Sequence, residues 1–270
     1  MIPPASPETI SRMSSAKGRT TRAFRQLRAA KSTWLLVRIL LLVQAIPSLW
    51  NIFNPDGPDR VSQLQYLLGL NPHNAVSGQY WQFLSYCFIH GNWSHLLLNA
   101  AAILLLGSKL EHYIAKRSFW ILAALSTFVG AGLFSACELL LPLTAGLASP
   151  TLVGSSAICF AFLLFLTTLS PESKFLPFFM SGRSIGICII ILNLFLTALN
   201  PNLPSGPLAE WGAYLSLNYS PDLFKVSHAC HLGGSLVGFF YGKWLLRPRI
   251  NLVRLRRARE KQERRAEASR

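Results

Sequence analysis

The stretch HGNWSHLLLNAAAILLLGSKL, residues 90–110, places polar side chains at the mouth of a long apolar segment. Two imidazoles, His90 and His95, and the carboxamide of Asn99 lie just before or inside the start of the apolar run Leu96–Leu110. Polar groups within a membrane are costly, so they usually mark chemistry. The stretch therefore predicts a membrane-spanning helix that carries functional side chains near one end.

Composition places the whole chain in the same class. Of its 270 residues, 51% are hydrophobic and only 14% are charged, which is typical of membrane proteins and not of soluble domains. Crossing about 30 Å of hydrocarbon takes about 20 apolar residues in a helix. We expect an all-α integral membrane protein, a bundle of six transmembrane helices near residues 33–53, 93–114, 119–142, 152–170, 184–200 and 226–246.

The net charge of +15 is concentrated at the two ends of the chain. Of the 26 Lys and Arg residues, 7 lie before residue 33 and 11 lie from Lys243 onward. Basic segments that flank membrane spans are typical of the cytoplasmic side. Both termini are therefore expected to be cytoplasmic, and no nucleic-acid partner is expected. With six spans, His90, His95, Ser156 and His231 then fall near one level, toward the lumenal or extracellular face.

This pattern predicts one membrane domain, residues 33–246, between two basic flanks. Residues 1–32 are expected to form a disordered cytoplasmic segment, although their Ser, Arg and Ala content is also typical of mitochondrial targeting. Residues 247–270 are expected to form a cytoplasmic tail with helix-forming residues and mixed charge. Basic residues near a membrane surface are attracted to anionic headgroups, so both tails are expected to contact lipid.

Helical spacing organises the polar residues into two groups. His95 and Asn99 are four residues apart, about 40° around a helix, so they share one face. His231 lies at the top of a ridge of small residues that includes Ser235, Gly238 and Gly242, and such ridges let helices approach closely in lipid. The natural neighbour of this ridge is the segment that begins at Ser156.

A serine and an imidazole in contact are the parts of a nucleophile and its base. A serine hydroxyl needs a base to accept its proton, and the oxyanion that follows needs hydrogen-bond donors. Ser156 is the candidate nucleophile and His231 the candidate base, with His95, Asn99 and the backbone of Ser156 as donors. No acidic residue is placed to orient His231, which favours a dyad with the ring packed against Phe160.

Other interpretations of these residues remain open. Ser156 could only cap a helix, since serine is common at that position, and Ser155 could be the nucleophile instead. A metal site would draw on the four histidines at positions 90, 95, 228 and 231. His90 and His95 are five residues apart, whereas a zinc-binding pair on a helix normally has a spacing of four. No metal and no cofactor are therefore expected.

Taken in order, these motifs resemble the rhomboid family of intramembrane serine proteases, across roughly residues 33 to 246. The resemblance rests on His90, His95 and Asn99 followed by Gly107 and Glu111, on Gly154-x-Ser156, and on His231-x-x-Gly234-x-x-x-Gly238. It implies that Ser156 is the nucleophile and His231 the general base, with His95 and Asn99 in the oxyanion site. It also implies a structural role for His90 in its loop, and for Glu111 at the opposite helix end.

The sequence departs from the rhomboid pattern at two positions. Ala157 follows the nucleophile where the family usually has glycine, which adds a methyl group at a crowded place. Trp81-Gln82 stands where Trp-Arg is common, which removes a charge that would brace the loop. The segment from Asn200 to Lys225 should cap the site, but its prolines, at 201, 204, 207 and 221, leave its path unpredicted.

The resemblance implies an endopeptidase that cleaves single-span or other transmembrane substrates near the lumenal side. The alternative is a catalytically inactive rhomboid-like protein that binds membrane clients for trafficking or degradation. Asn218, in an Asn-x-Ser sequon on the expected lumenal side, is a candidate for glycosylation. A secretory-pathway membrane, Golgi or endoplasmic reticulum, is expected, with the mitochondrial inner membrane as the alternative.

Overall fold

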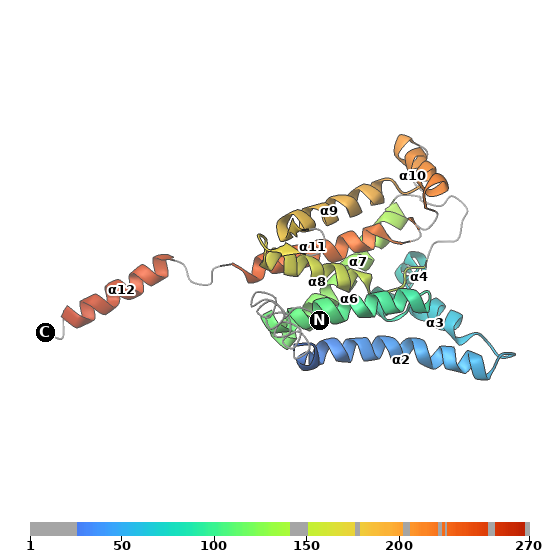
Figure 1. Ribbon diagram of the computed structural model, residues 1–270, viewed down its shortest axis with the longest axis horizontal. Coiled ribbons are helices and arrows are strands. Elements are labelled where there is room, and N and C mark those ends of the chain that lie inside the picture. Colours follow the sequence, from blue (N-terminus) through green and yellow to red (C-terminus); the bar gives the residue numbers. More distant parts are fainter. Residues whose placement is uncertain are drawn as a thin grey trace, which may run out of the picture.

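The computed structural model describes residues 26–140, 151–175, 179–201, 206–220, 223–224, 226–247 and 252–267. Long helices run side by side through the body of the molecule (Figure 1). Six of them correspond to the segments predicted from hydropathy: α2 (Lys31–Phe53), α6 (Trp93–Tyr113), α7 (Lys116–Leu140), α8 (Ser156–Leu169), α9 (Gly182–Ala198) and α11 (His228–Leu245).

Three of these helices, α2, α6 and α7, are both long and apolar enough to cross a membrane. The helices α8 and α9 are apolar but shorter, and α11 has 18 residues. An apolar, helical membrane protein is therefore confirmed. The number of spans and the side of each terminus stay predictions. Residues 141 and 142, the end of the third predicted segment, lie outside the described residues.

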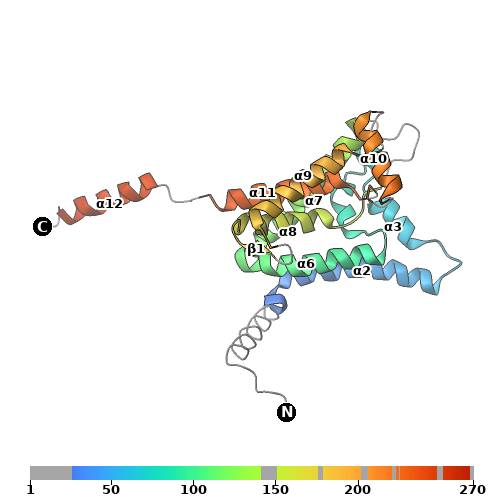
Figure 2. The same ribbon diagram turned by 45° about the horizontal axis from the view of Figure 1, so that its top comes forward.

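The remaining elements lie at the two ends of the bundle. Figure 2 shows α3 (Arg60–Leu68) and α10 at one end and α12 standing apart beyond the other. The fold has a small departure from the all-α expectation, because two short strands pair antiparallel with Lys174 opposite Ser181. The other short elements are α4 (Pro72–Val76), α5 (Gln82–Ser85), η1 (Tyr86–Phe88), β1 (Lys174–Phe175), β2 (Met180–Ser181), α10 (Pro207–Asn218) and α12 (Leu252–Glu267).

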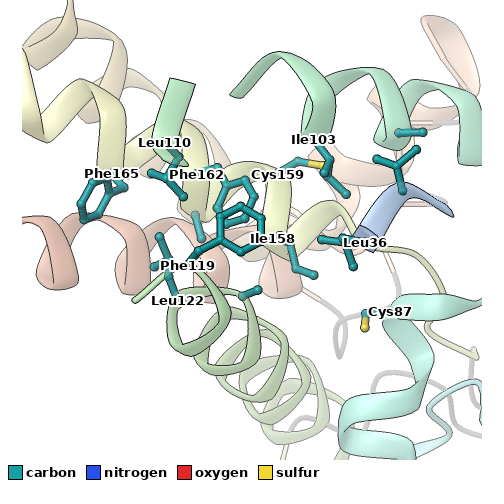
Figure 3. Packing of buried hydrophobic residues seen from close by; sticks show 14 of the residues in the cluster. Leu36, Cys87, Ile103, Leu110, Phe119, Leu122, Ile158, Cys159, Phe162 and Phe165 are labelled. Atoms are coloured by element: carbon teal, nitrogen blue, oxygen red, sulfur yellow. The ribbon is translucent and has the colours of Figure 1, made fainter. Parts of the chain in front are cut away.

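The centre of the bundle is α8, which contacts α6, α7, α9 and α11. Its sequence is apolar around the whole circumference, as expected for a helix that is buried on all sides. Figure 3 shows Phe162 and Ile158 of α8 packed with Phe119 of α7 and Leu36 of α2. The buried core therefore surrounds α8 and fixes the position of its first residue, Ser156.

Helix α8 begins later than the predicted segment 152–170. Leu152 does not join the helix because its N–H and C=O each form a 2.9 Å hydrogen bond with the backbone of Leu70. The N–H of Gly154 then donates to the carbonyl of Tyr86 at 3.0 Å. These contacts hold residues 151–154 as an extended segment and delay the start of α8 to Ser156.

Glycines bring α11 into close contact with α8. A Cβ atom at Gly234 would overlap the backbone carbonyl of Ala157, and one at Gly238 would overlap the carbonyl of Ala161. The two helices can approach this closely only because these side chains are missing. The small-residue ridge predicted from the sequence therefore packs on α8.

Glu111 lies at the opposite end of the bundle and caps a neighbouring helix. Its carboxylate accepts hydrogen bonds from the backbone N–H groups of Ser32 and Thr33, at 3.1 and 2.6 Å, and from the Thr33 hydroxyl. The first N–H groups of a helix have no partner within it, and a negative charge there is favourable. Gly107 lies one turn away, where a Cβ would come 2.8 Å from Thr33 Oγ1.

Gln82 braces the loop before His90, where the sequence predicted that replacing the usual arginine would remove a stabilising charge. Its side chain is fully buried, and its Oε1 accepts the N–H of Asn71 at 3.0 Å. Its Nε2 donates to Gln79 Oε1 at 2.7 Å and lies 3.4 Å from the carbonyl of Leu67. A neutral amide therefore connects α5 with the end of α3.

Candidate active site

Ser156 and His231 are in hydrogen-bonding contact. The distance between Ser156 Oγ and His231 Nε2 is 2.8 Å, although the two residues are 75 positions apart in the chain. Ser156 is the first residue of α8, and His231 lies in the first turn of α11. The close packing of these two helices at Gly234 produces the contact. This distance is within the range that a nucleophile and its base require.

Aromatic rings hold the imidazole of His231 on two sides. The ring of Phe160, one turn after Ser156, stacks on it with centroids 4.5 Å apart and planes 28° apart. This contact was predicted from the spacing of Phe160 and Ser156. His228 approaches the edge of His231 at 6.0 Å, and its Nε2 lies 2.8 Å from the carbonyl of Leu223. These ring contacts restrict the orientation of the His231 imidazole, as an acidic residue does for the histidine of a triad.

His95 and Asn99 face the same small space beside Gly154. A Cβ atom at Gly154 would lie 2.8 Å from His95 Nε2 and 3.5 Å from Asn99 Nδ2. Gly154 also has a φ of +111°, a conformation that favours glycine. A Cβ atom there would also lie 2.6 Å from His95 Cε1, so glycine is required for the His95 ring to approach the backbone two residues before Ser156.

The Asn99 amide is positioned with a free donor. Asn99 is 7% exposed, and its buried Nδ2 has no hydrogen-bond partner in the described part of the chain. The thiol of Cys159 lies 3.6 Å from Asn99 Oδ1, on the other side of the amide. A buried donor without a partner is costly, so it calls for an explanation such as a ligand or a catalytic role. An oxyanion would supply the missing acceptor.

His90 holds the segment that leads into α8. The side chain is fully buried, and its Nε2 lies 3.4 Å from the backbone nitrogen of Ser155 and 3.3 Å from the Ser155 hydroxyl. Burial, with the neighbouring His95 ring as a smaller cause, lowers the pKa of His90 to about 4. The ring is therefore neutral near pH 7, and its Nε2 can accept the Ser155 N–H. Ser155 faces His90 and not His231.

The methyl group of Ala157 fits against a glycine on α7. Ala157 is 1% exposed, and a Cβ placed on Gly130 would lie 3.0 Å from the Ala157 Cβ. The same Cβ on Gly130 would lie 3.0 Å from the carbonyl oxygen of Cys230. Gly130 therefore provides the room that Ala157 uses. This pairing could not be predicted from the sequence, because helical periodicity does not identify contacts between separate helices.

Two further predictions concern a metal site and the position of Asn218. Among the described residues, no three His, Cys, Asp or Glu side chains lie close enough together to hold a metal ion. Asn218 was expected in a loop, but it is the last residue of helix α10. Its Nδ2 donates to the carbonyl of Tyr214 at 2.9 Å. Pro204 and Pro221 of the capping segment lie outside the described residues.

Comparison with known proteins adds an independent observation to this geometry. The family model of the Rhomboid domain matches residues 77–248, more than half of the chain. The chain belongs to the rhomboid family. A search of curated proteins finds no match. The rhomboid domain includes the helices that carry Ser156, His231, His95 and Asn99, and it leaves α2, α3 and α12 outside the matched range.

Membership of the rhomboid family supports an intramembrane protease-like protein in an integral membrane setting. Inactive rhomboids carry the same domain, so membership alone does not decide between catalysis and client binding. The chemistry must therefore be argued from the side chains. In this rhomboid Ser156 of α8 contacts the imidazole of His231 of α11, and the unpartnered Nδ2 of Asn99 of α6 lies against Gly154, two residues before Ser156.

Proposed function

We propose that this rhomboid is a serine endopeptidase that cleaves transmembrane-helix substrates near their lumenal end. The observation that carries the proposal is the 2.8 Å contact between Ser156 Oγ and His231 Nε2. Ser156 attacks the carbonyl carbon of the scissile bond while His231 takes the hydroxyl proton. His231 then gives that proton to the leaving amine, and water hydrolyses the acyl-enzyme by the same route in reverse.

The tetrahedral intermediate needs donors for its oxyanion. The candidates are Asn99 Nδ2, the His95 ring and the backbone N–H of Ser156, which as a first-turn group has no acceptor within α8. The side chains of His95 and Asn99 both lie against Gly154, two residues before Ser156, and we place the oxyanion at this group of donors. No cofactor takes part in these steps.

The length of α8 supports cleavage below the membrane surface. Its 14 residues span about 21 Å, compared with about 30 Å of hydrocarbon. If its C-terminal end reaches one boundary, Ser156 lies roughly 9 Å inside the other. A substrate helix must unwind locally to bring a backbone carbonyl to that depth. Single-span proteins with helix-destabilising residues near this level are the proposed substrates.

A cavity beside the site offers room for a substrate side chain. Its volume is about 280 Å³, and it borders the extended segment before Ser156. Its lining combines polar and apolar groups from this segment, from α3 and from the loop before α6: Ser62, Gln65, Tyr66, Gly91, Thr151 and Val153. An extended substrate placed along residues 151–154 would reach both the cavity and the serine.

The proposed topology has six spans with both termini in the cytoplasm. The described helix ends support it: Lys109, Lys116 and Arg117 lie at the end opposite Ser156, as do Lys243 and Arg247. Helix α12 would then lie along anionic cytoplasmic headgroups. The proposed organelle is the Golgi or endoplasmic reticulum, with the mitochondrial inner membrane as the alternative. Microscopy of the tagged full chain with organelle markers distinguishes them.

The test of the proposed reaction is cleavage in a defined membrane. The purified chain and the Ser156→Ala variant are each reconstituted with a model single-span substrate, and a fluorophosphonate probe reports the reactivity of the serine. We expect cleavage and labelling with the unaltered chain and neither with the variant. Cleavage that survives Ser156→Ala would exclude the proposed nucleophile. No cleavage by either form, across several substrates, would favour client binding.

Substitution of Asn99 tests the oxyanion site. Asn99→Ala removes a buried donor that has no partner among the described residues, so we expect kcat to fall about 10²–10³-fold. KM should change little, because the bond forms with the transition state. Asn193 provides a matched control: its Nδ2 donates to the Ile189 carbonyl within α9 at 2.9 Å. An equal loss with Asn193→Ala would show that the effect of Asn99→Ala comes from the fold.

A further inference from the structure

Helix α10 exposes a broad apolar face near the site. Four large side chains point away from the protein, with exposed fractions of 52% for Leu208, 62% for Trp211, 51% for Tyr214 and 82% for Leu217. Glu210 is the only charged residue among the twelve of α10. A short surface helix in contact with water would carry more charge, and an apolar patch of this kind marks a contact with a partner or a membrane.

The opposite face of α10 is fixed against the end of α9. Ala209 and Gly212 are buried, and a Cβ atom at Gly212 would overlap the carbonyl oxygen of Leu199. Residues at positions 209 and 212 share a helical face, since they are three apart. The orientation of α10 about its own axis is therefore set by this packing, and Trp211 and Tyr214 must face outward.

Helix α9, the neighbour of α10, also exposes apolar side chains. Ile187, Ile191 and Phe195 are each more than half exposed and share one face of α9, spaced four residues apart. In a membrane helix such a surface contacts lipid. Figure 1 shows α10 directly after the end of α9, and the two helices are in contact. The exposed face of α10 therefore lies next to the end of a helix whose own exposed side chains are apolar.

Other exposed aromatic residues mark the same level of the bundle. They lie in the segment between α2 and α6, or at its borders with those helices, with exposed fractions from 43% to 70%: Trp50, Tyr66, Tyr80, Trp81 and Trp93. Trp and Tyr concentrate at membrane interfaces, where one part of the ring is apolar and the other can contact headgroups and water. This end of the bundle therefore carries an aromatic belt.

We propose that α10 is an interfacial helix that lies in the lipid headgroup region beside the site. Trp211 and Tyr214 lie at the centre of the exposed face and are placed at the level of the aromatic belt, with Leu208 and Leu217 at the two edges of the face, about 180° apart around the helix. The partner of this face is lipid, because it adjoins the lipid-facing surface of α9. The contact of Gly212 with Leu199 connects this interfacial helix to the end of α9. Five residues after α10, the carbonyl of Leu223 contacts His228, which packs against His231.

Quenching of Trp211 fluorescence in proteoliposomes tests this proposal. The emission of Trp211 is obtained as the difference between the full chain and the Trp211→Phe variant, which keeps an aromatic ring at an exposed position. We expect this emission to lose most of its intensity in lipids brominated near the headgroup, less in lipids brominated near the chain end, and little with aqueous iodide. Trp244, 53% exposed on α11, gives the positive control for lipid quenching.

Each other result contradicts the proposal in a distinct way. Strong quenching by iodide without quenching by lipid would place α10 in water. Quenching by neither would mean that a second copy or another protein covers the face. A glycan on Asn218, whose position is within about 20° of Trp211 around the helix, would also contradict it. The measurement can be made with Ser156→Ala, so failure of the proposed reaction does not affect it.

Discussion

Replacing His231 with alanine is expected to lower the rate of substrate cleavage by about four to six orders of magnitude. The variant leaves Ser156 without the group 2.8 Å away that takes its proton, and without the acid that protonates the leaving amine. Single-turnover cleavage of a fluorogenic transmembrane substrate in proteoliposomes measures the loss. Labelling of Ser156 by a fluorophosphonate should fall in parallel, since it needs the same activation of the hydroxyl.

Two comparisons separate a lost base from a damaged fold. His112→Ala removes an exposed imidazole at the other end of α6 and should leave the rate unchanged. The double variant Ser156→Ala, His231→Ala should be no slower than either single variant, because residues that act as a unit are not additive. A cleavage rate within about tenfold of the unaltered chain after His231→Ala would exclude the dyad.

The sequence predicted those features of the site that depend on spacing along one helix. The positions of His95 and Asn99 on one face of α6, and the small-residue ridge of α11, both follow from helical geometry. The family resemblance is confirmed by the match over residues 77–248. The helices themselves follow from the apolar segments, because segments of this length in lipid must satisfy their backbone hydrogen bonds internally.

The features that sequence analysis missed depend on contacts between distant segments. The start of α8 is set by the pairing of Leu152 with Leu70, and periodicity within one segment does not reveal such a partner. The buried hydrogen bonds of Gln82 depend on the path of a whole loop. One missed element did carry a signal: Pro207 stands at the start of α10, and proline is favoured in the first turn of a helix.

The contact between α8 and α11 is expected to fail when Gly238 acquires a side chain. In Gly238→Ala the new methyl group would overlap the carbonyl oxygen of Ala161, which belongs to the backbone of a helix and cannot rotate away. One of the two helices must move. Overpacking of this kind costs about 1–3 kcal/mol, and we expect the upper end of that range because both contacting elements are rigid. Unfolding in mixed detergent micelles, followed by circular dichroism, measures the change.

Gly132→Ala is the matched control for this substitution. Gly132 also lies within a long helix, but a Cβ atom there would have no neighbour within 4 Å. Its replacement should be neutral or stabilise α7 by up to about 1 kcal/mol. Equal destabilisation by both variants would show that the loss of glycine matters in itself and not the fit at Ala161. If the fit matters, the folded fraction of Gly238→Ala should also cleave more slowly, since a shift of α11 away from α8 lengthens the contact between Ser156 and His231.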